Sequence, residues 1–492
     1  MMMLLVYYAF LILATALIVR NAYKMWQINN DFTLPIITFF MFYFTIAGAY
    51  IFPLDAYFEF KGASMGLHYL PIFDRLFKVS FDFTYVLSIA YYVFFILIFQ
   101  YTYLLVVKKY IYPKQLQSKA DFGINLEVVI RPWLVVALSL SLIFMSAFIL
   151  RDEILYSISH GKSIYIITRS TTNKYYTWHQ LANEFCVLIP YLAFSFAIVK
   201  SNKFGIRVID KKSTIISLFI SCAISSVYIA MLGNRREILS GIVVCILISV
   251  NNYRNIHLKR FVYLFVMVMV LFLSNDFLRS TIIPRQINKV FNIKGDQQLN
   301  WKNDDEFFTS DKTSAADKGK QVLSSFLFSN ELFYAHFSMY GVLHREVPIT
   351  YGSSFVNLAA SAVPRALYPN RPLDIYNYYA TQVNAAKGQI YTLHHATAWY
   401  LNFGLVGIFI GALILAFIFS FALWVQSHMF KSKSPFILLT KYLISFLLCA
   451  QIVTFITAGP EAYKALIVEG VIIPVVLLRL CLRKQNSLKD SL

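Results

Sequence analysis

Long apolar runs constrain this chain more than any other feature of its sequence. A transmembrane helix needs roughly 20 mostly apolar residues, and its backbone polar groups must be bonded within the segment. The mean hydropathy of +0.60 and a charged fraction of only 14% agree with several such segments. The sequence therefore predicts an all-α polytopic membrane protein with about eleven transmembrane helices. The runs lie at 2–19, 33–52, 83–107, 133–150, 181–199, 213–232, 237–250, 261–275, 396–424, 435–457 and 463–480.

Basic residues gather in connectors that lie on one side of these helices. Lysine and arginine follow the third, fifth, seventh, ninth and last runs, among them Lys108, Lys200, Arg254, Lys431 and Arg483. All of these are odd-numbered connectors, and the positive-inside rule places them in the cytoplasm. We therefore expect the N-terminus outside and the C-terminus inside. The net charge of +19 then faces anionic lipid, and no nucleic-acid partner is expected.

The longest connector follows the eighth run, on the outer side. Residues 276–397 carry 12 Lys and Arg against 10 Asp and Glu, so this loop is nearly neutral. Loops of this length usually have a function. Residues 294–320 are predicted to be a mobile flap, and the amphipathic pattern at 322–342 predicts a helix on the membrane surface or on the loop's own core. The predicted divisions are 1–275 with helices one to eight, 276–395 as the large periplasmic loop, and 396–492 with three further helices and a cytoplasmic tail.

The end of this loop carries the densest set of candidate site residues. The segment VPRALYPNRP places Arg365 and Arg371 among three prolines, which predicts a rigid, extended clamp. His394 and His395 follow, directly before the ninth apolar run. A helix N-terminus disfavours imidazolium, so we expect a neutral pair of which one acts as general base. The alternative is an interfacial pair bonded to the backbone, with Trp399 in the aromatic belt.

Arginines also lie at two other outer helix ends. The turn GNRRE holds Arg235 and Arg236 where the seventh run begins. Arginines at a helix N-terminus form a ready anion site, and a pyrophosphate is the expected anion. The alternative is that they anchor the helix or pair with the adjacent glutamate. Arg279 and Arg285 follow the eighth run; either they face the same site, or Arg279 pairs with Asp276.

Motifs for nucleotide binding and for zinc-protease chemistry are missing from the sequence. It contains no Walker P-loop and no HExxH, and no GxGxxG that opens a helix after a strand. The five cysteines lie in or beside apolar runs without metal-ligand spacing, so we expect no metal site. Without a nucleotide site, any sugar donor must already be activated, and no cofactor is expected.

The quoted residues resemble a known family. The string YGSSF…VPRALYPNRP followed by HHATAWYLNFGLVG is similar to the Wzy-type O-antigen polymerases, which are bacterial oligosaccharide repeat-unit polymerases. In that family a Pro-Arg clamp precedes a histidine and a helix rich in small residues. The turn GNRRE resembles a Gly-x-Arg turn shared with the O-antigen ligases. The likeness covers 350–407 and this turn, and elsewhere it is one of hydropathy only.

The resemblance implies an inverting, metal-independent glycosyltransferase with a GT-C-like fold on the periplasmic face of the bacterial inner membrane. Its donor would be a growing glycan on undecaprenyl pyrophosphate, and its acceptor a new lipid-linked repeat unit. Membrane lipid and a chain-length regulator protein would be partners. An O-antigen ligase and a lipid-linked oligosaccharide flippase are the alternatives. The expected catalytic residues are His394 and His395, and the expected substrate-binding residues are Arg235, Arg236, Arg279, Arg285, Arg365, Arg371 and Trp399.

Overall fold

The protein is predominantly helical in the computed structural model, and the predicted apolar runs coincide with helices wherever the structure describes them. The run at 261–275 lies outside the described residues. Five of the described helices are long and apolar enough to span a membrane, namely Met2–Gln27, Phe83–Ile111, Pro132–Ile149, Ser213–Met231 and His395–Val425. The described residues are 2–29, 33–53, 76–77, 79–111, 128–164, 167, 176–198, 206–208, 212–251, 282–292, 335–360, 374–384, 393–427 and 435–484.

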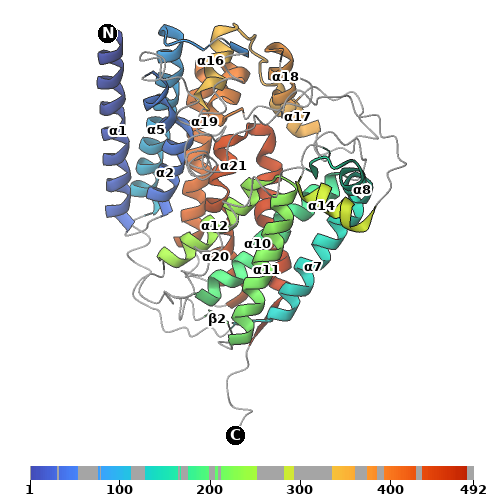
Figure 1. Ribbon diagram of the computed structural model, residues 1–492. Helices are drawn as coiled ribbons and strands as arrows, with labels where there is room; N and C mark the ends of the chain where they lie inside the picture. Colours follow the sequence, from blue (N-terminus) through green and yellow to red (C-terminus); the bar gives the residue numbers. More distant parts are fainter. Residues whose placement is uncertain are drawn as a thin grey trace. The chain divides into compact units, whose positions relative to one another are not determined.

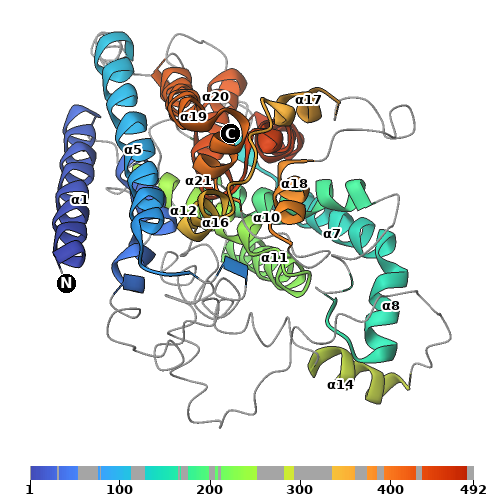
Figure 2. The same cartoon turned by 90° about the horizontal axis from the view of Figure 1, so that it is seen from above.

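The chain forms two compact units, and the first contains Met1–Phe122, Leu323–Lys431 and Ile444–Val468. Within it, α5 packs against α1 and against α19, and α16 packs on both α5 and α19 (Figures 1 and 2). Its elements are α1 (Met2–Asn29), α2 (Thr33–Thr45), η1 (Ala47–Tyr50), α5 (Phe83–Val106), η3 (Val107–Ile111), α16 (His336–His344), α17 (Ser353–Ala360), α18 (Ile375–Gln382), α19 (His395–Ser427), α21 (Ile452–Thr457) and η8 (Pro460–Ala462).

The second unit contains Gly123–Val322, Ser432–Leu443 and Glu469–Leu492. Its central helix is α10, which packs against α7, α11 and α12. The helices α20 (Pro435–Ala450) and η9 (Ala465–Ile472) have residues in both units. The other elements are β1 (Val128–Ile130), α7 (Pro132–Ile149), α8 (Arg151–His160), α10 (Tyr176–Ile198), β2 (Ile206–Val208), α11 (Lys212–Met231), α12 (Arg235–Asn251), α14 (Ile282–Phe291), α22 (Ile473–Leu480) and β3 (Leu482–Lys484).

Local sequence explains where several helices begin. Asp82 precedes α5 and accepts a hydrogen bond from the Tyr85 backbone N–H at 2.8 Å. After α11, Gly233 takes a left-handed φ of 81°, which glycine adopts without a Cβ clash. The next helix, α12, then starts at Arg235, where the GNRRE turn predicts it.

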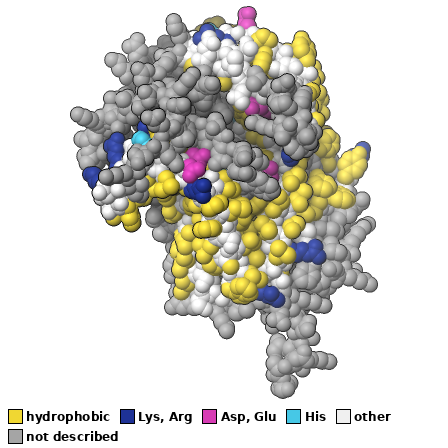
Figure 3. Space-filling model, turned by 90° about the vertical axis from the view of Figure 1, so that its right-hand side faces the viewer, with side chains coloured by type: hydrophobic (Ala, Val, Ile, Leu, Met, Phe, Trp, Pro, Cys, Tyr) yellow, Lys and Arg dark blue, Asp and Glu magenta, His cyan; other side chains and the backbone are white. Residues whose placement is uncertain are grey.

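The long helices expose apolar side chains. On α7 the side chains of Trp133, Phe144 and Phe148 are exposed, as are those of Leu405 and Val406 on α19. Figure 3 shows such side chains, in yellow, gathered over one face of the described residues. Soluble monomers rarely expose large contiguous apolar surface. These faces are therefore suited to contact with lipid.

A small sheet in the second unit was not predicted. In it, β1 lies between β2, which runs parallel to it, and β3, which runs antiparallel. Each strand has only three residues, too few for an alternating pattern to stand out in the sequence. The sheet joins the connectors after the third and fifth apolar runs to the C-terminal tail.

The amphipathic helix expected at 322–342 is described only from residue 335 on, and it differs from the prediction. The observed helix α16 is buried against α5 and α19, not placed on a membrane surface or on the loop's own core. Its side chains Phe337 and Tyr340 are 0% exposed, and Phe337 meets the ring of Phe52 edge-on at 5.0 Å. Aromatic packing therefore decides its position. The predicted flap at 294–320 lies outside the described residues.

Candidate functional site

The two candidate histidines lie at the start of α19, as predicted. The helix begins at His395, and the carbonyl of His394 accepts the first hydrogen bond, from Ala398 N, at 2.9 Å. Both side chains are buried, with exposures of 0% for His394 and 1% for His395. Burial forces each ring nitrogen either to find a partner or to remain unpaired at a free-energy cost. The two histidines resolve this differently.

The ring of His395 has both nitrogens engaged. Its Nδ1 lies 2.9 Å from the carbonyl oxygen of Ala458, which can only accept, so Nδ1 carries the proton. Its Nε2 accepts from Trp399 Nε1 at 3.0 Å and lies 3.0 Å from the Tyr463 hydroxyl. These contacts fix one neutral tautomer and leave no free lone pair. In this arrangement His395 positions its neighbours and is poorly placed to accept a proton from substrate.

Trp399, for which the sequence also suggested a place in an aromatic belt, is buried inside the protein. It is 0% exposed, and its indole N–H is donated to His395. Its ring packs so closely on Gly411 that a Cβ there would lie 2.5 Å from the ring atoms Cγ and Cδ1. Burial of so large a side chain is favoured because Gly411 leaves room for it.

The ring of His394 is in the opposite situation. Neither of its nitrogens has a hydrogen-bond partner among the described residues, and the ring of Tyr92 meets it edge-on at 6.3 Å. Burial, with smaller contributions from the neighbouring His336 and His395, lowers the pKa of His394 to about 3. The predicted neutral form therefore agrees with this pKa, although burial and not the helix dipole is its main cause. Of the two, His394 is the histidine whose ring nitrogens no described residue engages.

The TYGSSF segment is bonded directly to α19. The helix is broken near its second turn, where Gly404 has φ 63° and ψ −144°. The break leaves the Leu401 carbonyl to accept from Thr350 N at 2.7 Å. One residue on, the Asn402 side chain accepts from Ser354 N at 3.2 Å and donates to Ser354 Oγ at 2.9 Å. The TYGSSF and HHATAWYLN segments thus meet at one place.

A carboxylate that the sequence reasoning missed completes this region. Both oxygens of Glu461, in η8, accept from Ile375 N at the start of α18, at 3.0 and 3.1 Å. Burial raises the pKa of Glu461 to about 7; the Ile375 N–H opposes that shift and Asp374 adds to it. The sequence contains a signal for this residue, because Glu461 is a charged residue in the short outer connector 458–462. Arg235 was predicted as a site residue on the same ground, since it lies in a short outer connector.

The structure describes the remaining predicted site residues to different extents. The side chains of Arg235 and Arg236, at the start of α12, are not described. Arg285 is exposed on α14 and lies against Gly161 at the end of α8, where a Cβ would be 2.7 Å from its Cγ. The residues outside the described part of the chain are Arg279, Arg365 and Arg371, with the prolines of the predicted clamp.

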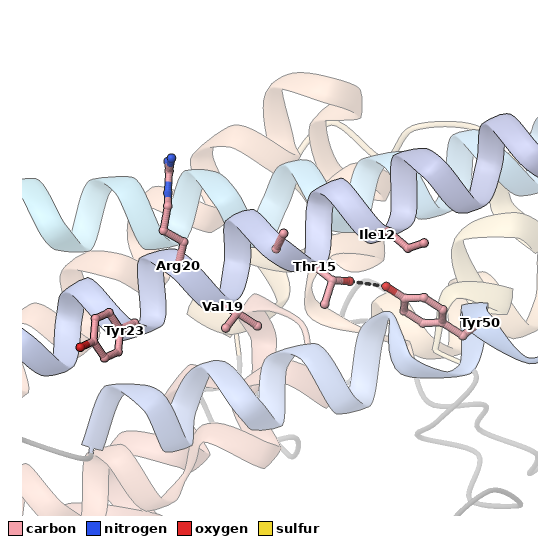
Figure 4. A pocket seen from close by; sticks show the side chains of 7 residues that line it. Ile12, Thr15, Val19, Arg20, Tyr23 and Tyr50 are labelled. Carbon is pink, nitrogen blue, oxygen red and sulfur yellow. Dashed lines mark hydrogen bonds between the residues drawn. The ribbon is translucent and has the colours of Figure 1, made fainter.

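A cavity of about 640 Å³ lies along α1 in the first unit. In Figure 4, Val19 and Tyr23 point toward α2 and Arg20 points away from it. None of the described residues that line this cavity is an acid, a histidine or a cysteine. Its lining residues are Ile12, Thr15, Ala16, Val19, Arg20, Tyr23 and Tyr50.

Among the described residues, no group of three or more His, Cys, Asp or Glu side chains could hold a metal ion.

No protein-family model, no curated protein and no solved structure matches this chain.

Proposed function

We propose that this chain is a polysaccharide polymerase of the bacterial inner membrane. It transfers a growing glycan from undecaprenyl pyrophosphate onto the non-reducing end of a new lipid-linked repeat unit. The observation that carries the proposal is the meeting of the TYGSSF and HHATAWYLN segments at the outer end of α19. Thr350 and Ser354 bond to this helix, and His394 lies at its start with both ring nitrogens unpaired among the described residues.

We further propose eleven transmembrane helices, a GT-C-like fold and a periplasmic 276–395 loop. The sheet supports this count, because β2 and β3 both bond to β1 and so belong to one side of the membrane. An even number of crossings must then separate β2 from β3. Between them the described helices α11, α12, α19, α20 with α21, and η9 with α22 would supply five. The apolar run at 261–275 is the natural sixth crossing.

A reporter that is active only in the periplasm should be active when fused after Lys320 and inactive when fused after Arg254. The two positions flank the 261–275 run, so the pair tests that crossing directly, and protein levels of both fusions serve as the control. Inactivity at Lys320 would mean that 261–275 does not cross, and it would remove the 276–395 loop from the periplasmic face.

The proposed chemistry needs no nucleotide at the site. Arginines hold the pyrophosphate and stabilise its charge as the bond from the anomeric carbon to the phosphate oxygen breaks. The acceptor hydroxyl attacks that carbon from the opposite face, which inverts it, and His394 takes the hydroxyl proton. Undecaprenyl pyrophosphate leaves with the bonding electrons. Arg365 and Arg371 are proposed to fix the mouth of the site.

Lipopolysaccharide from a deletion strain tests this function against its nearest alternative. Loss of a polymerase should leave core carrying a single repeat unit, because the ligase still attaches one unit. Loss of a ligase should leave bare core. Re-expression of the chain should restore long polymer, and bare core in the deletion strain would overturn the proposal.

A further inference from the structure

The loop between α16 and α17 frames a cavity that the proposed chemistry does not use. Its volume is about 450 Å³, within the range of roughly 300–1,000 Å³ that is common for small-ligand sites. Val342 and Leu343 line it from the end of α16, residues 346–349 and Tyr351 line it from the loop, and Tyr400 lines it from α19. All of these residues belong to the first unit.

The loop that forms one wall is tied at two points. The Thr350 backbone N–H donates to the Leu401 carbonyl at 2.7 Å, which fixes the loop to the break in α19. The hydroxyl of Tyr378, on α18, donates to the Pro348 carbonyl at 2.9 Å. The wall is therefore held in place before any ligand arrives, which reduces the entropy lost on binding.

The backbone of this wall is also unusual. Glu346 and Tyr351 both take left-handed φ values, 48° and 49°, which residues other than glycine adopt uncommonly. Such conformations persist where their surroundings impose them, and they cluster at ligand sites. Here both left-handed residues, Glu346 and Tyr351, have side chains that could bind a ligand.

The chemistry of the lining is aromatic and acidic. Tyr351 is 85% exposed, and the ring of Tyr400 stacks on Tyr91 with centroids 5.8 Å apart. The exposed carboxylate of Glu346 has no ion-pair partner among the described residues, and none of the described residues that line the cavity is a Lys or Arg. Aromatic faces accept the C–H face of a sugar ring, and a carboxylate accepts bonds from its hydroxyls. The same carboxylate repels phosphate and pyrophosphate.

We infer that this cavity is a binding subsite for a sugar residue without negative charge, which stacks on Tyr351 or Tyr400 and donates hydroxyl protons to Glu346. The inference rests on the proposed function, because the sugar belongs to the lipid-linked repeat unit. Tyr400 follows His394 by six residues, roughly 9 Å along a helix, so the cavity and the proposed base belong to the same end of α19.

The test uses the purified full chain in lipid nanodiscs and the repeat-unit oligosaccharide released from its lipid carrier by mild acid. Saturation-transfer NMR should show binding to the wild type, and inorganic pyrophosphate should not compete. Tyr351→Ala and Glu346→Gln should each raise the Kd at least tenfold, whereas Tyr351→Phe, which keeps the ring, should stay within about threefold. Tyr110→Ala is the matched control, because Tyr110 is an exposed tyrosine on η3 and does not line the cavity.

The outcomes distinguish a failure of the proposed subsite from a failure of the proposed function. Unchanged affinity in both the Tyr351→Ala and the Glu346→Gln proteins overturns the subsite, as does a wild type that polymerises repeat units without binding the free oligosaccharide. A wild type that binds, loses affinity in these variants and yet makes no polymer supports the subsite and refutes the proposed reaction. Glu346→Gln changes an exposed side chain at constant size, so it keeps the test valid if Tyr351→Ala fails to fold.

Discussion

Replacing His394 by glutamine should lower the polymerisation rate by about 10²–10⁴-fold, the usual contribution of a positioned general base. Glutamine fills a similar volume but cannot take up the proton of the acceptor hydroxyl. The rate is measured on purified lipid-linked repeat units in vesicles, with the amount of membrane-inserted protein determined in parallel. A near-normal rate in this variant would exclude His394 as the base.

His395→Gln is the matched control at the neighbouring position. This change leaves the Trp399 indole N–H or the Ala458 carbonyl without its buried partner, at a cost of roughly 1–3 kcal/mol. We expect a lower melting temperature and a rate reduced much less than by His394→Gln. The reverse ranking of the two rates would assign the base to His395.

The pH dependence distinguishes His394 from Glu461. A base acts while deprotonated, and burial lowers the pKa of His394 to about 3, so its lone pair stays available from pH 8 down to about 5. The rate should then be flat over this range. So weak a base suffices, because the attacking hydroxyl becomes strongly acidic once its oxygen begins to bond to the anomeric carbon. If Glu461 were the base, the rate would fall below its pKa of about 7 by up to tenfold per pH unit.

Much of the helical framework could be predicted because the bilayer imposes it. Any segment that crosses must be long and apolar, so hydropathy locates α1, α5 and α19 without knowledge of their neighbours. Turn chemistry works in the same local way. Gly233 ends one helix and Arg235 begins the next, and both positions follow from the letters GNRRE.

The interior of the site could not be predicted, because its contacts join residues far apart in the chain. His395 and its partner Ala458 are separated by 63 positions, and Ser354 and Asn402 by 48. A single sequence contains no local pattern for such pairs. It therefore identified the histidines as a pair but did not show which of them has a free lone pair.

Replacing Gly407 by alanine should prevent the protein from accumulating in a folded form. A Cβ at this position would lie 2.0 Å from the carbonyl oxygen of Trp399 and 2.7 Å from its carbonyl carbon. Contacts this short with backbone cannot be relieved by rotating a side chain. Overpacking of this kind typically lowers the stability by 1–3 kcal/mol. Because the contact here is with rigid backbone, we expect a loss on the order of 4–5 kcal/mol.

The measurement is the yield of monodisperse detergent-solubilised protein and its melting temperature. Val406→Ala is the matched control, since Val406 is 62% exposed on the same helix, and its yield and melting temperature should stay close to wild type. Gly404→Ala should lower the stability by an intermediate amount, about 1–3 kcal/mol, because φ 63° with ψ −144° is a conformation that essentially only glycine adopts.

The reason for so large an effect lies in the break of α19. Turning the chain at Gly404 brings the next turn against the Trp399 carbonyl, and this close approach is possible only because residue 407 has no side chain. Relief of the clash would require α19 to straighten, which would separate Leu401 from Thr350 and Asn402 from Ser354. A folded Gly407→Ala protein with normal stability would therefore contradict the break itself. The break is the physical basis for bringing the TYGSSF segment to the start of the histidine-bearing helix, so this result would remove that basis as well.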